Sequence, residues 1–141
     1  MWHADFATRL ESWNSLRTQT QTLPIESALV AINDWWFAAP WHAYHLHWDD
    51  VEEWPDPWQL LSDNVYCDVA RGLGILYTIT LLDREDLASA SLILTEDGYN
   101  LVLLDQTKYI LNWEKNTIVN TNQEVKVKRQ LTQKQIQAQY L

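Results

Sequence analysis

The chain has 141 residues, 47% of them hydrophobic, and its 19 acidic and ten basic side chains give a net charge of −9. This length supports one hydrophobic core, and the negative charge argues against nucleic acid as a partner because it repels phosphates. No apolar run is long enough to span a membrane, the first residues lack the pattern of a signal peptide, and a single cysteine cannot form an internal disulfide.

Two amphipathic helices are predicted within residues 1–39. The first carries apolar side chains at helical spacing, namely Phe6, Leu10, Trp13 and Leu16. Pro24 suits the first position of the second helix, which must end before Pro40. One face of this second helix carries Ile25, Ala28, Leu29, Ile32 and Trp36. Both helices should therefore pack an apolar face against the core.

Residues 35–58 hold six of the nine tryptophans, three of the four histidines and three of the four prolines. Such a segment must be buried or must dock on a partner, because exposing six indoles to water would promote association. We expect it to contribute both to the core and to an interface, with contact residues Trp41, Trp48, Trp54 and Trp58. The sequence WPDPW at 54–58 is typical of a stiff corner pinned to the core, and a cleft for a sugar ring or a proline-rich peptide is the alternative.

The same segment offers candidate metal ligands: His42, His45, His47, Asp49 and Asp50. Imidazoles and carboxylates bind zinc and other divalent ions. The apolar residues between the histidines favour packing instead, and the acidic run lacks the Asp-x-Asp-x-Asp-Gly spacing of a calcium loop. We therefore predict no metal, no cofactor and a solvated acidic loop.

A third helix is predicted to begin at Pro57, because Asp56 suits the N-cap position and Gln59 can close a capping box. It should run, with a break near residues 62–64, to Gly72 or Gly74. The residues near helical spacing along it are Trp58, Leu61, Val65, Val69 and Leu73. We expect this face to pack on a sheet and to bury Trp58.

Beyond Gly74 the pattern changes to short β-prone segments at 75–82, 89–95, 99–105 and 108–113, with turn residues at 96–98 and 105–107. Gaps this short cannot hold crossover helices, so the strands should form an antiparallel meander. N-terminal helices and a cysteine-bearing helix, packed on such a meander, define an α+β fold. We expect it to occupy a single domain over residues 1–123.

Residues 124–141 form a basic, glutamine-rich tail with four bases against one acid, so the tail carries +3 and the rest of the chain −12. Val125, Val127 and Leu131 predict one more strand. The remainder is expected to order only on a partner, because it is polar and has few core-forming residues. A basic tail on an acidic body favours docking on acidic surfaces, with contacts from Lys126, Lys128, Arg129 and Tyr140.

The segment CDVARGLGILYTI at 67–79 resembles the papain-like core of the transglutaminase-like superfamily, with Cys67, Ala70 and Gly74 over the family's cysteine, helix alanine and helix-ending glycine. The resemblance implies a nucleophilic cysteine near the N-terminus of a helix, with a histidine and an aspartate on successive strands. Here the stretch from Cys67 to Gly74 is shorter than the family's helix, and all four histidines precede the cysteine. Asn100 or Asn112 stands where the strand histidine is expected. Such a chain would have lost catalysis, because a thiol without a base is poorly ionised.

Two further interpretations of Cys67 follow from the residues themselves. His45 or His47 could reach the thiol from an earlier loop and act as its base, as in cysteine proteases whose histidine precedes the cysteine. A lone cysteine near Val65 and Val69 is more often a small buried hydrophobe. We favour the buried hydrophobe and expect no enzyme activity.

Residues 35–79 as a whole are similar to small structural proteins of tailed bacteriophages, especially T4-like phages of cyanobacteria. The resemblance implies a virion component of the tail, baseplate or neck, assembled in the host cytoplasm and present in several copies. Its partners would be other virion proteins, with neither nucleic acid nor membrane among them. A small cysteine hydrolase or amidase using Cys67 is the alternative function.

Overall fold

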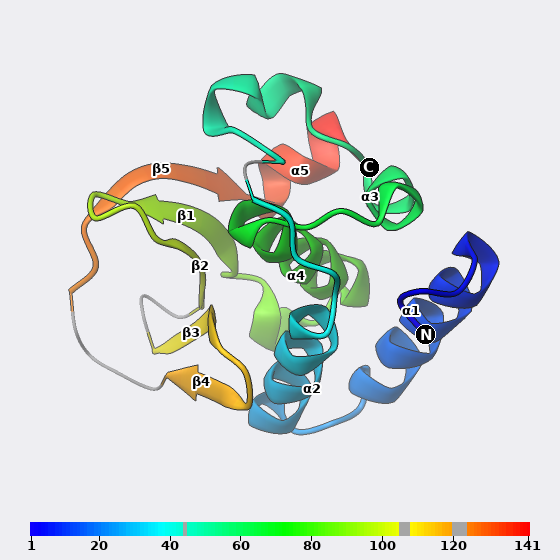
Figure 1. Ribbon diagram of the computed structural model, residues 1–141. Coiled ribbons are helices and arrows are strands. Elements are labelled where there is room, and N and C mark those ends of the chain that lie inside the picture. The colour runs from blue at the N-terminus through cyan, green and yellow to red at the C-terminus, as the bar shows by residue number, and fades with distance from the viewer. Residues whose placement is uncertain (44, 105–107, 120–123) are drawn as a thin grey trace.

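A computed structural model describes residues 1–43, 45–104, 108–119 and 124–141. Its helical elements are α1 (Phe6–Thr20), α2 (Ile25–Phe37), η1 (Trp48–Glu53), α3 (Pro57–Asp63), α4 (Asp68–Leu82), η2 (Glu85–Leu87) and α5 (Gln133–Gln139). Its strands are β1 (Ser91–Thr95), β2 (Asn100–Leu104), β3 (Tyr109–Glu114), β4 (Thr117–Val119) and β5 (Val127–Thr132). Helix α4 lies at the centre, with the sheet on one side and the N-terminal helices on the other (Figure 1). The predicted α+β class is confirmed.

The first two helices form as predicted. Asp5 caps α1 by accepting a hydrogen bond from the Thr8 backbone N–H at 2.9 Å. Helix α2 ends before Pro40, and the inner side of its predicted apolar face is buried: Ala28, Leu29, Ile32 and Trp36. None of the helices among the described residues is both long enough and apolar enough to cross a bilayer.

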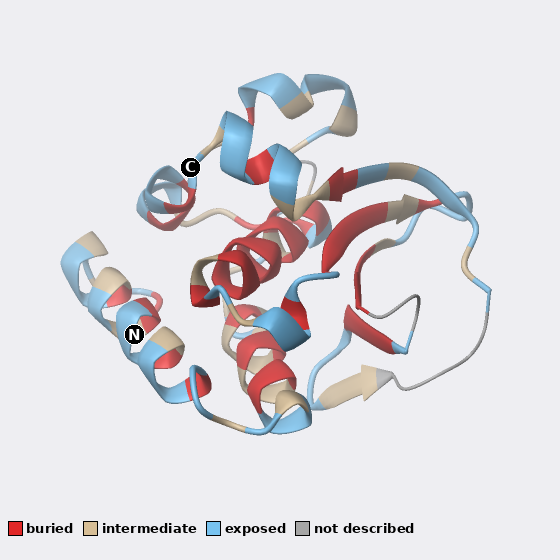
Figure 2. Ribbon diagram, turned by 180° about the vertical axis from the view of Figure 1, so that it is seen from behind, coloured by how far each residue is buried: buried red, intermediate tan, exposed pale blue. Residues whose placement is uncertain are grey.

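The predicted break in the third helix is confirmed, but its predicted end is wrong. Helix α3 stops at Asn64, which adopts a left-handed conformation with φ 54°, and α4 starts afresh at Asp68. Residues 75–82, predicted to be a strand, form the second half of α4. This half is buried on nearly every side, so the sequence shows an apolar run without the period of an exposed helix (Figure 2). Thr78 and Thr80 fit the helix by donating hydrogen bonds to the carbonyls of Gly74 and Leu76.

The sequence predicted that Trp58 is buried in the core, and this prediction is wrong because of the break. Its side chain is 44% exposed, because the chain turns at Asn64 and the assumed continuous face from α3 into α4 does not exist. Helix α3 buries Leu60 and Leu61 instead. Asp56 does cap this helix, accepting from the Gln59 N–H at 2.8 Å, while the Gln59 side chain bonds to Asp63 and leaves the capping box open.

The centre of the core is a group of indoles around one threonine hydroxyl. Trp13 and Trp36 each donate from Nε1 to the Thr78 hydroxyl oxygen at 2.9 Å. Helix α4 approaches closely enough for this because residue 74 is glycine; a Cβ there would lie 2.5 Å from the Trp36 ring. Both buried N–H groups are thereby satisfied without a water molecule.

The sheet has the order β4-β3-β2-β1-β5 and is antiparallel throughout, so the predicted meander exists in β1 to β4. The predicted turn at 96–98 contains Gly98 at φ 92°, whereas the turn predicted at 105–107 lies outside the described residues. Alternate residues face α4 and join the main core: Leu92, Val102, Leu104, Leu111 and Leu131. The opposite sheet face carries a second apolar cluster of Ile93, Leu101, Leu103 and Ile110.

The expectation that the C-terminal tail orders only on a partner is wrong. Strand β5 forms as predicted and pairs with β1, and α5 follows it directly. The Thr132 side chain and Gln135 close a capping box at the start of α5, and Ile136 is completely buried. One apolar side chain at the right helical position thus anchors an otherwise polar segment to its own domain.

Candidate functional site

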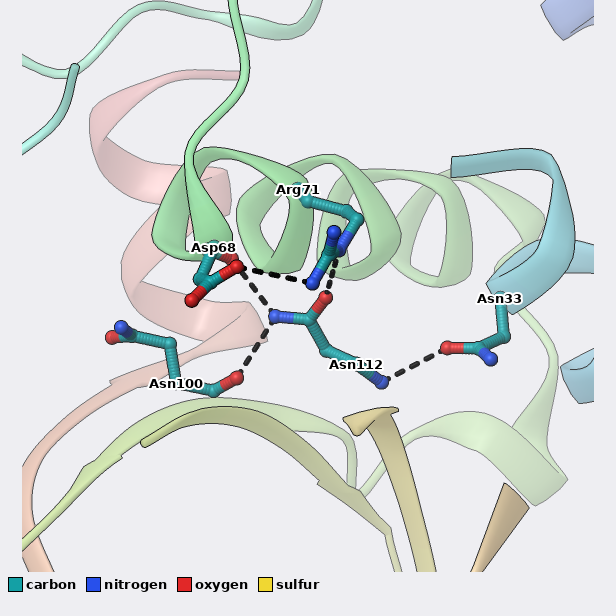
Figure 3. Close-up of polar contacts among 5 residues, drawn as sticks. All are labelled: Asn33, Asp68, Arg71, Asn100 and Asn112. Carbon is teal, nitrogen blue, oxygen red and sulfur yellow. Dashed lines mark hydrogen bonds and ion pairs between the residues drawn. The ribbon is translucent and has the colours of Figure 1, made fainter. Parts of the chain in front are cut away.

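Polar side chains meet where the N-terminus of α4 approaches β2 and β3 (Figure 3). Asn112 of β3 donates from Nδ2 to the backbone oxygens of Asp68 and Asn100, each at 2.8 Å. Its Oδ1 accepts from Arg71 Nε at 2.6 Å. One buried amide group therefore ties the first turn of α4 to two strands.

Asn112 also has an unusual backbone, with φ 67° in the left-handed region that asparagine tolerates better than most residues. Its backbone N–H donates to Asn33 Oδ1 of α2 at 2.9 Å, and Asn33 donates in turn to the Glu114 carbonyl. Residue 72 is glycine where α4 passes, and a Cβ there would lie 3.1 Å from Asn112 Nδ2. Helices α2 and α4 and strand β2 thus converge on one residue, Asn112.

Arg71 supplies the positive charge of this cluster. Burial lowers the pKa of its guanidinium, and the Asp68 carboxylate, 3.2 Å away, opposes that shift. The guanidinium also stacks 3.9 Å from the centre of the Phe37 ring. An arginine keeps its proton at neutral pH, so it stays a fixed cation that orients Asn112.

Cys67 is the N-cap residue of α4 and is buried. Its sulfur accepts a hydrogen bond from the Leu46 backbone N–H at 3.4 Å. Beside it lies a hollow of about 290 Å³, lined also by Trp41 and Asn100. The Asn100 amide oxygen accepts from Trp48 Nε1 at 2.8 Å. The thiol and the Asn100 side chain therefore share one small cavity.

The candidate bases and metal ligands do not line this cavity. His45 is half-buried and His47 is exposed, and within the described residues no hydrogen bond joins either imidazole to Cys67. The His47 carbonyl instead accepts from Trp54 Nε1 at 2.9 Å. The described part of the chain holds no group of three or more His, Cys, Asp or Glu side chains arranged around a cation.

The predicted interface residues divide into three groups. Trp41 is 63% exposed, and Trp58, Lys126 and Lys128 also lie at the surface. Trp54, by contrast, is only 4% exposed and packs in the core, which corrects its assignment to an interface.

The other three predicted contact residues hold the η1 segment to the body. Arg129 donates to the Trp48 carbonyl at 3.0 Å and lies 3.6 Å from the Asp49 carboxylate. The Tyr140 hydroxyl donates to the Val51 carbonyl, and burial raises the pKa of that phenol. Contacts expected with a neighbour are therefore made within the chain.

Sequence reasoning missed an exposed aromatic pair at the end of the sheet. Tyr99 and Trp113 are 50% and 46% exposed, and their ring centres lie 5.0 Å apart at an angle of 64°. They border a hollow of about 610 Å³ on the sheet face opposite α4. The alternation of Tyr99, Leu101 and Leu103 along one strand is the signal that could have indicated an outward apolar face.

No protein-family model, no curated protein and no solved structure matches the chain. Its chemistry therefore has to be argued from its own side chains. Asn100 lines the Cys67 cavity, and Asn112 donates a hydrogen bond to Asp68, the residue that follows Cys67. The side-chain amide of an asparagine does not titrate and cannot accept a proton from a thiol. The hydrogen bonds of Asn112 hold α4 against the sheet.

Proposed function

We propose that this protein is a non-enzymatic structural and assembly component of a tailed-phage virion, acting through protein–protein contacts. The observation that carries the proposal is the exposure of four large aromatic side chains, each at least 44% exposed: Trp41, Trp58, Tyr99 and Trp113. Tryptophan and tyrosine are enriched at the energetically important centres of interfaces. Tyr99 and Trp113 also lie against each other, so these two form one exposed patch rather than two scattered side chains.

Among the described residues no hydrogen bond joins Cys67 to a base, which argues against catalysis. The thiol is buried, accepts a backbone N–H and shares its cavity with an amide. The kind of assembly is taken from the similarity of residues 35–79 to phage structural proteins. On this proposal the partners are other virion proteins, the protein is present in several copies, and neither nucleic acid nor membrane is bound.

A small cysteine hydrolase is the second candidate, and one observation favours it. Cys67 is the N-cap residue of a 15-residue helix, and the N-terminal end of a helix stabilises a thiolate through its dipole. This thiol also borders a cavity. The resulting arrangement is the one a nucleophilic cysteine requires, apart from the base.

The Cys67→Ser substitution separates the two candidates. We expect a phage that carries only this variant to form plaques at the wild-type titre, because serine keeps the size and hydrogen-bonding capacity of the side chain. The hydrolase predicts a loss of orders of magnitude, as follows removal of a catalytic nucleophile. Equal urea midpoints of the variant and wild-type proteins provide the control for folding. A lost titre with the fold preserved would overturn the proposal, and joint substitution of His45 and His47 would then identify the base.

A further inference from the structure

The hollow beside Tyr99 and Trp113 has the construction of a binding site. Its apolar floor is formed by Leu101 and Ile110 of the sheet and by Val125, which packs on the second apolar cluster. Its volume of about 610 Å³ falls within the range of about 300–1,000 Å³ that is usual for ligand sites. We call it the outer-face hollow.

The rim of the outer-face hollow is negative. Exposed carboxylates of Glu96, Asp97 and Glu124 border it, against the single ammonium group of Lys126. Within the described residues none of these three carboxylates takes part in an ion pair. They are therefore available to a cation from outside the chain.

The aromatic pair adds a second preference for a cation. Tyr99 and Trp113 stand edge to face at the mouth of the outer-face hollow, with half of each ring accessible. The face of an indole attracts a guanidinium group, which also stacks on it as a flat plate. A carboxylate next to the ring can accept two hydrogen bonds from the same guanidinium.

We propose that the outer-face hollow binds a segment of a partner protein in which arginine alternates with apolar side chains. The apolar side chains fill the floor, and the arginines lie across Trp113 toward the acidic rim. This inference rests on the proposed function and deepens it, because it names the chemistry of one partner surface. The site shares no lining residue with the Cys67 cavity and is separate from it.

The test uses the full chain and the synthetic peptide acetyl-Ala-Leu-Arg-Leu-Arg-Ala-amide, with binding measured by isothermal titration calorimetry. We expect saturable binding that weakens about tenfold or more in Trp113→Ala, as for a residue at the centre of an interface. The double variant Glu96→Gln/Asp97→Asn should weaken it as well and should reduce its dependence on salt. Replacing both peptide arginines by citrulline keeps the shape, removes the charge and should abolish binding.

Matched variants elsewhere on the surface supply the controls. Trp41→Ala removes an indole that is more exposed than Trp113 but does not line this hollow, and Asp56→Asn/Asp63→Asn removes two acids from the α3 region. Both variants should leave the affinity for the peptide unchanged. Absence of peptide binding to the wild-type chain, or equal losses in the control variants, would overturn the proposal. Binding of a neutral sugar such as cellohexaose through Trp113, without peptide binding, would assign the hollow to carbohydrate instead. Because the assay needs no virion, its failure is distinguishable from failure of the proposed function.

Discussion

Replacing Trp36 by alanine is expected to lower the free energy of unfolding by about 3–5 kcal/mol, the usual range for a large aromatic side chain removed from a core. The ring is fully buried, lies against Gly74 of α4 and contacts Trp2 and Tyr66 at ring-centre distances of 5.6 Å each. Its loss leaves a cavity that rigid neighbours cannot fill. The hydrogen bond to Thr78 is lost at the same time.

Trp58→Ala is the matched control, since it removes the same side chain from the surface of α3. We expect it to cost about 1 kcal/mol or less, because much of the indole is already in water. Urea unfolding with a common slope gives both values. Similar losses in the two variants would show that the packing of α2 on α4 is not the main source of stability.

Replacing Asn112 by alanine is expected to cost about 4–5 kcal/mol. Three side-chain hydrogen bonds are lost, each worth about 1 kcal/mol net, and Arg71 Nε is left without its acceptor. Alanine also tolerates the positive φ of this position less well than asparagine. The first turn of α4 should separate from the sheet more readily as a result.

Asn116→Ala controls for the backbone contribution. Asn116 also has a positive φ, 62°, but its side chain is exposed in the turn between β3 and β4. Only the conformational cost of about 1–2 kcal/mol should remain there. Unfolding free energies that fall equally in the two variants would contradict the structural role assigned to the Asn112 amide.

Local signals predicted much of this fold. The periodic apolar residues of α1 and α2, the Asp56 cap and the alternating strands β1 to β3 are all features that neighbouring residues determine. The segment 75–82 was misread because complete burial removes the helical period, and burial depends on distant parts of the chain. The prediction that the tail lacks structure of its own is wrong, although Thr132 and Gln135 have the spacing of a capping box.

The candidate site was predicted less fully. The resemblance to the transglutaminase-like core predicted a cysteine at the start of a helix, and Cys67 is the N-cap residue of α4. Asn100 lines the same cavity as Cys67. The bridging role of Asn112 depends on a positive φ and on partners from α2, α4 and β2, which no short sequence pattern contains. The pairing of Tyr99 with Trp113 depends likewise on the register of β2 against β3.

The proposed role as a building block of a virion is tested most directly by counting the protein in phage particles. Phage particles are purified through successive density gradients, and the chain is quantified by mass spectrometry against the major tail protein. We predict a constant, small whole-number ratio per particle in every infectious fraction. Absence of the chain from intact particles, or a ratio that falls with each purification step, would contradict the claim.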